Sequence, residues 1–245
     1  MARKWIPATR SQGEYSRQAH CDLPPETYER EISKEGFFGP AAFIHHRHPP
    51  TAWSGFEGPL RPRAFDLAKL GQAQASPWDA PVVLRNSATE LRFWRLHDAM
   101  PSLVRNGDGD QLLFVHMGRA EFFCDYGHLP VEAGDYVVIP RGTMWRLEPV
   151  GQMAMLLIEA CNTHFTLPDR GMVGPHAVFD PAILDAPAMN DRFRAQQHGA
   201  GRDWQVHVKK RGAVSVITYP FNPLDATGWH GDLSPVRLNV RDIRP

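Results

Sequence analysis

Three histidines close to the N-terminus form the densest group of side chains that could do chemistry. His45, His46 and His48 stand in the string His-His-Arg-His-Pro-Pro. In an extended segment His46 and His48 would share a face, so their imidazoles could chelate one metal ion. No carboxylate follows at a fixed spacing, and the prolines favour an arm that packs on a barrel or on a neighbouring subunit. We therefore expect no metal on this chain, and His45, His46 and His48 remain the candidate ligands.

Two further histidines lie in glycine-containing strings. His230 stands between Gly228 and Gly231, which allow the backbone to approach another group closely. It is the candidate catalytic residue, placed to line a cleft between domains, and the alternative is a turn histidine bonded to the backbone. His176 is expected to hold a loop by hydrogen bonding. The acidic string at 107–110 lacks the length and alternation of a calcium loop, so it predicts a turn.

The composition excludes several classes of function. The chain of 245 residues carries 27 Lys and Arg against 27 Asp and Glu, which argues against a nucleic-acid groove or an anionic membrane as partner. No apolar run approaches the roughly 20 residues of a membrane span, and the first residues lack the apolar segment of a secretion signal. Cys21, Cys124 and Cys161 are odd in number and far apart, which is typical of reduced thiols in the cytoplasm. Cys124 and Cys161 fall in expected strands and suit the core.

The chain divides into an irregular first part and a part rich in short strands. Residues 1–80 are repeatedly interrupted by proline, and predict an extended arm with at most one short helix near 26–34. Residues 81–220 predict a mainly β sandwich or barrel. The expected strands are 82–84, 90–96, 111–116, 119–124, 136–139, 154–160, 204–209 and 214–219. A helical turn capped by Asp180 is expected after that residue, and Arg211-Gly212 should form the last hairpin turn.

The most specific local pattern is Gly134-x5-Pro140-x-Gly142. It resembles the second motif of cupins, which are small jelly-roll barrels, and the string 112–118 resembles the end of their first motif. Alignment on the motif glycines places the metal-ligand positions near Arg105 and Gly107, at Gln111 beside Asp110, and at Trp145. Arginine does not ligate metals and an indole offers only an N–H donor. We therefore expect a cupin-like barrel without a metal, with His116 and Trp145 as packing or interface residues.

Longer strings resemble the bacterial homogentisate 1,2-dioxygenase family, over essentially the entire chain. They are Ala2–Pro7, Glu35–Pro40, His45–Thr51, Arg61–Phe65, Asp110–Gly118, Gly134–Gly142, Leu167–Gly171, Gly174–His176 and Phe221–Gly231. The resemblance implies an Fe(II) enzyme that opens the ring of homogentisate with O2. The product is maleylacetoacetate, in tyrosine and phenylalanine breakdown. It further implies a trimer or hexamer of identical chains.

In that family the two His and one Glu that hold iron, and a catalytic His, lie in a C-terminal cupin half. The resemblance places that half after 221–245, so this chain resembles only the N-terminal part. No residue here takes over a ligand role, and the chain alone is expected to be inactive. The alternatives are a non-catalytic cupin that serves assembly, or a metal-free cupin that binds a small molecule. For the latter, Arg105, Gln111 and Trp145 would supply the polar groups.

Overall fold

A computed structural model describes residues 10–35, 38–59, 63–70, 72–166, 178–197 and 202–244. The strings at 2–7, 167–171 and 174–176, with His176, lie outside these residues. The chain forms two compact units, Met1–Phe65 and Asp66–Pro245. No helix in the described ranges is long and apolar enough to cross a bilayer.

The first unit is built around one antiparallel hairpin. Strand β1 (Tyr28–Glu35) pairs with β2 (Phe38–His46), with Tyr28 opposite His46. The short helix expected near 26–34 is therefore wrong. The charged residues of this segment suit a helix surface, but pairing with a second strand overrides local propensity, because strand formation depends mainly on the neighbours across the ladder.

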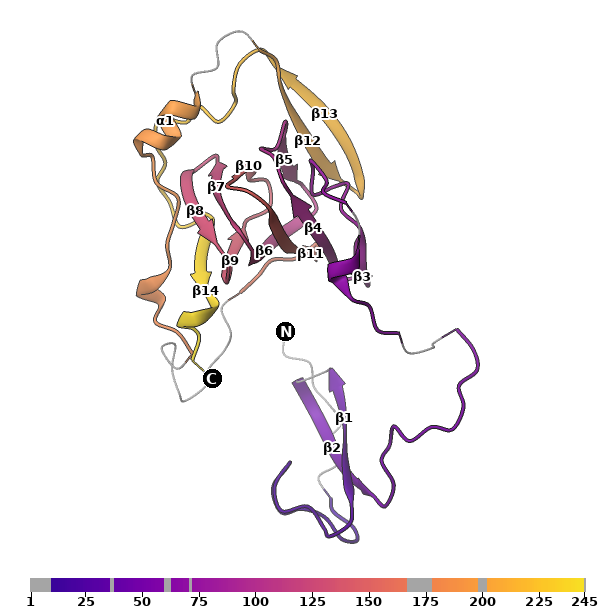
Figure 1. Ribbon diagram of the computed structural model, residues 1–245. Coiled ribbons are helices and arrows are strands. Elements are labelled where there is room, and N and C mark those ends of the chain that lie inside the picture. The colour runs from indigo at the N-terminus through magenta and orange to yellow at the C-terminus, as the bar shows by residue number, and fades with distance from the viewer. Residues whose placement is uncertain are drawn as a thin grey trace. The chain divides into compact units, whose positions relative to one another are not determined.

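The second unit consists of two six-stranded sheets (Figure 1). One has the order β14-β9-β6-β11-β4-β3 and is called the first sheet. The other has the order β13-β12-β5-β10-β7-β8 and is called the second sheet. The first sheet comprises β3 (Val82–Arg85), β4 (Thr89–Leu96), β6 (Gly109–Met117), β9 (Asp135–Ile139), β11 (Met153–Cys161) and β14 (Val236–Asn239). The second comprises β5 (Leu103–Asn106), β7 (Arg119–Cys124), β8 (Gly127–Glu132), β10 (Met144–Pro149), β12 (Trp204–Lys210) and β13 (Ala213–Tyr219).

Every strand expected between residues 82 and 219 is present. The pattern does not predict β5, β8, β10 and β14, which are short or contain proline. It also misses helix α1 (Asp191–Gln197), which is only two turns long. The turn after residue 180 is the 3-10 helix η3 (Pro181–Ile183), where the Asp180 side chain accepts from the Ala182 N–H at 2.9 Å. That cap confirms the expected start.

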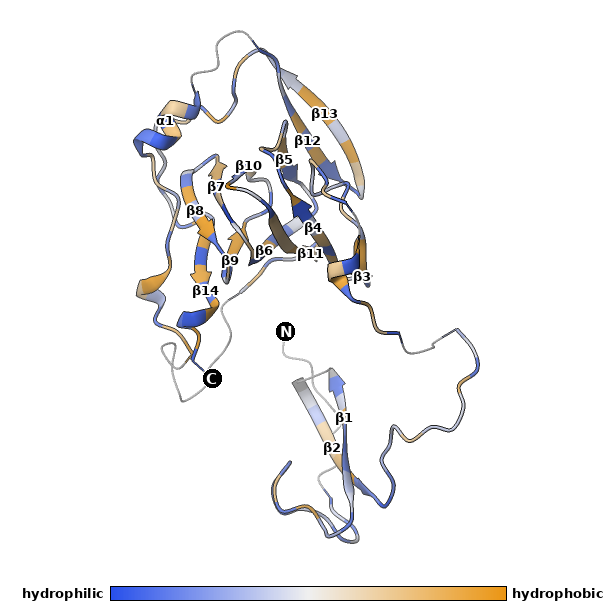
Figure 2. Cartoon of the chain, viewed as in Figure 1, coloured by the Kyte–Doolittle hydropathy of each residue, from blue (hydrophilic) through white to orange (hydrophobic). Residues whose placement is uncertain are grey.

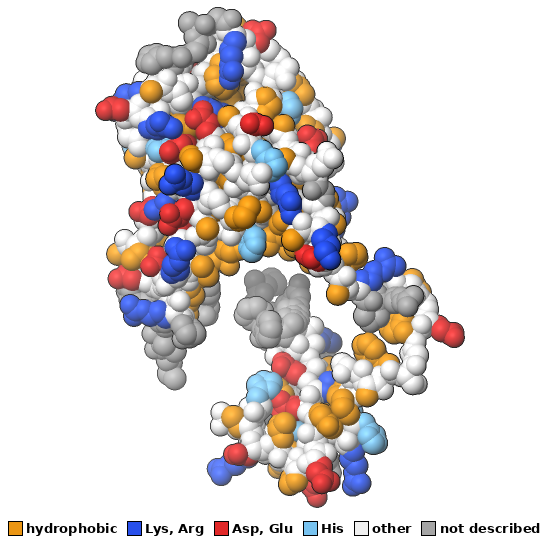
Figure 3. Space-filling model, in the orientation of Figure 1, with side chains coloured by type: hydrophobic (Ala, Val, Ile, Leu, Met, Phe, Trp, Pro, Cys, Tyr) orange, Lys and Arg blue, Asp and Glu red, His pale blue; other side chains and the backbone are white. Residues whose placement is uncertain are grey.

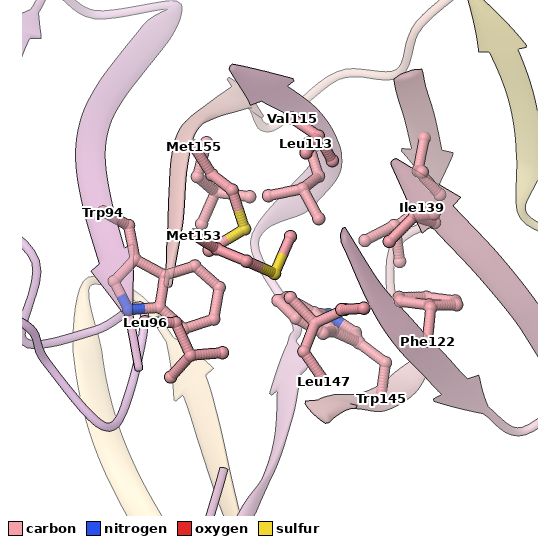
Figure 4. Close-up of a cluster of buried hydrophobic side chains, with 14 of the residues drawn as sticks. Trp94, Leu96, Leu113, Val115, Phe122, Ile139, Trp145, Leu147, Met153 and Met155 are labelled. Atoms are coloured by element: carbon pink, nitrogen blue, oxygen red, sulfur yellow. The ribbon is translucent and has the colours of Figure 1, made fainter. Parts of the chain in front are cut away.

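The core lies between the two sheets and is filled by alternate residues of each strand, as Figure 4 shows. Trp94 and Trp145 meet edge to face at 6.2 Å between ring centroids, and Phe122 stacks on Trp145 at 5.8 Å. All three side chains are fully buried. Burial of one such side chain stabilises the fold by about 1.5–3 kcal/mol, with roughly 1 kcal/mol more for each aromatic pair. The hydrophobic residues accordingly concentrate on the barrel strands (Figure 2).

Gly134 shows why the cupin-like pattern needs glycine at its first position. Its φ of +96° lies in the left-handed region. Its N–H donates to the Val115 carbonyl at 2.8 Å, and its carbonyl accepts from the Val240 N–H at 2.8 Å. The turn into β9 is therefore held from strand β6 and from the 3-10 helix η4 (Val240–Asp242), which follows β14. Gly142, at the end of the pattern, has a φ of +89°. Both glycines thus form the turns that the pattern predicts.

Candidate functional site

The sequence analysis placed metal-ligand positions in the barrel interior, and two of these positions, Gln111 and Trp145, hold bulky buried side chains. Trp145 on β10 donates its indole N–H to the Gln111 amide oxygen on β6 at 3.2 Å. Both side chains are buried. Arg105 lies half-buried beside Met144, with its guanidinium 3.9 Å from the Met144 sulfur. An indole, an amide and a guanidinium offer no metal-binding set.

A buried cluster of charges lies beside this pair, and sequence reasoning missed it. Glu90 on β4 stands opposite Glu159 on β11, which stands opposite Gln111, so the three form one row across the first sheet. Lys209, on β12 of the second sheet, forms an ion pair with Glu159, and its ammonium lies 3.7 Å from a Glu90 carboxylate oxygen. The Lys209 ammonium also lies 5.7 Å from the centre of the Trp78 ring.

Two arginines complete the neutralisation of Glu90. Arg85 lies 2.5 Å and Arg92 2.7 Å from its carboxylate oxygens. Burial by itself would raise the pKa of Glu90, but Lys209 and Arg92 reverse this, so the pKa lies below its ordinary value. Glu90 is therefore held as a carboxylate within the barrel. The only sequence signal for this cluster is a charged residue at an inward position of three strands that are distant in the chain.

The residues of this interior do not fit a two-His, one-Glu iron site. The two carboxylates of this interior, Glu90 and Glu159, already share the Lys209 ammonium, and the residues around them include Trp, Gln and Arg. Within the described parts of the chain, no group of three or more His, Cys, Asp or Glu could hold a metal ion. The Lys209 ammonium supplies the positive charge beside these two carboxylates.

The histidines at 45, 46 and 48 do not form a chelating face. His45 accepts a hydrogen bond from the Ser16 N–H at 3.0 Å and lies opposite Glu29 in the hairpin. Strand β2 ends at His46, and His48 follows in a bend. The extended geometry in which His46 and His48 share a face is therefore wrong, because the alternation of a strand stops before His48. His45 Nδ1 and His46 Nε2 are buried without a hydrogen-bond partner among the described residues.

His230 is exposed and lies in the irregular segment that connects β13 to β14. The neighbouring Trp229 packs edge to face on Tyr126 at 5.3 Å. Among the described residues His230 has neither an acidic nor an imidazole partner. The structure thus brings no second catalytic group to it, and its catalytic role stays a prediction.

In the acidic string at 107–110, Gly107 and Asp108 form the bend between β5 and β6, Asp110 lies at the start of β6, and both carboxylates accept hydrogen bonds from backbone N–H groups. Asp108 accepts from the N–H groups of Arg211 at 2.6 Å and Gly212 at 2.9 Å, which are the turn residues between β12 and β13. Arg211 and Gly212 have φ of +53° and +73°. A tight two-residue hairpin turn of type I′ requires a positive φ at both of its central residues. Asp110 accepts from the N–H groups of Arg141 and Phe165. These contacts confirm the turn and the hairpin at Arg211-Gly212.

Asp108→Asn is expected to lower stability by about 1–2 kcal/mol at pH 7, since it weakens two charge-assisted hydrogen bonds. Burial would raise the pKa of Asp108, but the Gly212 and Arg211 N–H groups lower it below its ordinary value. The stabilisation is therefore present above the pKa of the unfolded chain and is lost as pH falls through the folded pKa. Thermal unfolding of both proteins at pH 7 and at acid pH measures this. A difference that does not shrink on acidification would contradict it.

The cysteines differ strongly in environment, and all three are free thiols. Cys124 is fully buried, and burial raises its pKa to about 12. Cys161 is half-buried, and burial together with Glu159 raises its pKa. Cys21 is exposed. The expectation of two core cysteines thus holds fully for Cys124 and in part for Cys161.

Alkylation by iodoacetamide at pH 8 is expected to modify Cys21 first and to leave Cys124 intact in the folded protein. The reactive species is the thiolate. The Cys124 thiol, with a pKa of about 12, has about one part in 10⁴ of thiolate at pH 8. Peptide mass spectrometry over time gives the order, and labelling in denaturant shows that Cys124 can react. Early modification of Cys124 in the native protein would show that the core strand β7 opens readily.

Two facing sheets, an interior packed with side chains and the glycine turns at 134 and 142 define a cupin-like jelly-roll barrel. The chain belongs to the family described as homogentisate 1,2-dioxygenase N-terminal, whose model matches residues 80–240. The match leaves the motifs before residue 80 outside it.

Curated relatives bear the name of the same enzyme. The chain is 29% identical over 141 residues to a homogentisate 1,2-dioxygenase of Bradyrhizobium diazoefficiens, covering 57% of this chain and 30% of the relative. It is 30% identical over 151 residues to one of Rhizobium leguminosarum, covering 60% and 32%. The chain thus matches about a third of the length of these relatives. A cupin-2 domain protein of Shewanella frigidimarina is similar at 16% identity and a TM-score of 0.34, over 38% of this chain and 87% of that one.

Proposed function

We propose that this chain forms the N-terminal barrel of a ring-cleaving dioxygenase that converts homogentisate and O2 to maleylacetoacetate in tyrosine and phenylalanine catabolism. Family membership over residues 80–240 is the observation that carries the proposal. The names of the curated relatives support the same reaction. The barrel interior supports a structural part in that enzyme, because Trp145 and Gln111 stand at the positions aligned with cupin metal ligands and hydrogen-bond to each other.

It follows that the Fe(II) chemistry belongs to residues other than this barrel. The barrel has a structural part and provides contact surface in a cytoplasmic homo-oligomer, which is a trimer or a hexamer. The chain by itself is inactive, and His45, His46, His48 and His230 are the residues to mutate first if activity is found.

A structural cupin without enzymatic activity is the second candidate, and strand β13 favours it. β13 is the edge strand of the second sheet, and Val214, Val216 and Ile217 on it are exposed. It carries neither a charged residue nor a proline. An uncharged apolar edge strand offers unpaired backbone groups to a strand of another molecule. This surface would suit a protein whose task is assembly.

Oxygen uptake with homogentisate and Fe(II) separates these functions, on protein shown to be folded by circular dichroism. We expect no uptake from the chain alone. We expect uptake when the remaining two thirds of the Bradyrhizobium diazoefficiens enzyme is added as a separate polypeptide. Uptake by the chain alone would overturn the assignment of iron chemistry to other residues. Sedimentation velocity measures whether the chain associates with the added polypeptide. If the mixture shows neither oxygen uptake nor this association, the enzymatic proposal is overturned in favour of the structural cupin.

A further inference from the structure

A hollow of about 500 Å³ lies on the outer face of the first sheet, away from the packed barrel interior. Strands β4, β6 and β11 form its floor, and the segment 66–68 forms one wall. Along β4 the buried Trp94 and Leu96 face the core, so Phe93 and Arg95 face outward. Figure 3 shows hydrophobic side chains gathered along the edge of the barrel unit where Figure 1 places β6 and β11.

The hollow exists because a small residue stands between larger ones. Ala154 on β11 lies opposite Arg95 on β4, and one row further along Leu156 lies opposite Phe93. The methyl group of Ala154 leaves open the space that a longer side chain would fill. Leu156 and Phe93 supply an apolar floor beside it, and Met117 on β6 adds to that floor.

A β-bulge turns His116 toward the hollow. Met155 pairs with Val115 while Ala154 pairs with Met117, so His116 is an extra residue of β6 without a partner on β11. Such a bulge re-aims a side chain and is frequent beside functional sites. His116 is exposed and lines the hollow, together with His97, which directly follows β4.

Arg95 is held in place as a cationic wall. Its guanidinium donates to the Ala68 carbonyl, at the 3-10 helix η1 (Leu67–Lys69), and lies 5.6 Å from the centre of the Phe93 ring. Asp66 caps η1 through the Ala68 N–H at 3.0 Å, and its carboxylate lies 3.6 Å from the Lys69 ammonium. The one acid of the lining is therefore occupied by contacts of its own.

Arg95 is the cation of the described lining, and Asp66, its only acid, is engaged by Lys69 and by the Ala68 N–H. In the described part of the chain, no carboxylate lies within ion-pair distance of Arg95, His97 or His116. A guanidinium with two imidazoles suits an anion, and Arg in particular suits a carboxylate. The apolar floor requires that the rest of the ligand be hydrophobic. The volume falls within the range of small-molecule sites, about 300–1,000 Å³.

We propose that this hollow binds a small monocarboxylate with an aromatic or branched apolar body. The carboxylate pairs with Arg95 and with His97 or His116. The apolar body lies over Ala154 between Phe93 and Leu156. The site lies on the outer face of the sheet, so it is independent of the ring-cleavage chemistry and of the protein's place in a dioxygenase.

The test uses three probes in ligand-observed NMR titrations of the whole chain: phenylacetate, the neutral 2-phenylethanol, and acetate. Phenylacetate is expected to bind saturably with a Kd of about 1 mM or tighter, as its size allows. The alcohol and acetate, which each lack one half of the required chemistry, should bind at least about tenfold more weakly. Equal binding of phenylacetate and the alcohol would show an unspecific apolar surface and overturn the proposal, as would the absence of saturable binding.

Variants locate the site. Ala154→Phe fills the hollow and should abolish binding of phenylacetate, whereas Val214→Phe adds the same ring on the exposed strand β13 and should leave it unchanged. His116→Gln should weaken phenylacetate about threefold or more and leave the alcohol unchanged, which a merely structural effect would not do. Near-ultraviolet circular dichroism controls folding. Binding by Ala154→Phe equal to that of the unsubstituted chain would overturn the location.

Discussion

Replacement of Gly109 by alanine is expected to destabilise the barrel by about 3 kcal/mol or more. Gly109 begins β6 and pairs with Cys161 at the end of β11. An added Cβ would lie 1.9 Å from the Ala160 carbonyl oxygen and 2.9 Å from its carbon. Backbone atoms cannot turn aside as a side chain can, so the two central strands of the first sheet would have to separate.

Thermal unfolding measures this effect, and the expected fall in Tm is roughly 6–12 °C for a chain of this size. Gly228→Ala is the matched control. A Cβ at position 228 meets no atom within 4 Å and its φ lies outside the left-handed region, so stability should change by less than about 0.5 kcal/mol. If both variants melted alike, the tight pairing of β6 with β11 at this end would be incorrect.

The second large effect concerns the buried ion pair of Lys209 and Glu159. The two side chains are 8% and 5% exposed. Lys209→Met should cost about 3–5 kcal/mol, because it leaves Glu159 as a buried charge without a partner among the described residues. Glu90 is affected less, since Arg85 and Arg92 continue to neutralise it.

The double variant Lys209→Met with Glu159→Leu should recover most of this loss, because a hydrophobic pair of similar volume removes the unpaired charge. Urea unfolding of the single and double variants gives the coupling free energy. Arg194→Ala is the exposed control, since Arg194 and Asp191 pair at 2.8 Å in solvent and such pairs contribute about 0–1 kcal/mol. A double variant no more stable than Lys209→Met would contradict the role of the pair.

The mainly β fold was predictable because its signals are local. Short runs of β-branched and aromatic residues separated by Gly, Asn, Asp and Pro identify strands and turns without knowledge of what they pair with. The turns at Gly134, Gly142 and Arg211-Gly212 follow from the same chemistry, since only a few residues tolerate a positive φ. The missed strands β5, β8, β10 and β14 are stabilised mainly by their neighbours in the sheet.

The hairpin of the first unit shows the opposite case. Five of the eight residues from Tyr28 to Glu35 are charged and they do not alternate with apolar residues, so the segment's own pattern does not predict a strand. Its partner strand β2 supplies the pairing. The same dependence on the partner decided the histidine cluster, because the end of β2 at His46 removed the shared face with His48.

The sequence by itself determined the strand-rich architecture, the glycine turns and the absence of imidazoles at the cupin ligand positions, since each depends on residue types and spacing along the chain. Only the tertiary structure decided what occupies the barrel interior and its outer face. Lys209 meets Glu159 and Glu90 because β12 of one sheet crosses β4 and β11 of the other. Arg95, Ala154 and His116 come together because a bulge and a cross-strand register join three strands. Contacts between residues so far apart in sequence leave no periodic trace in it.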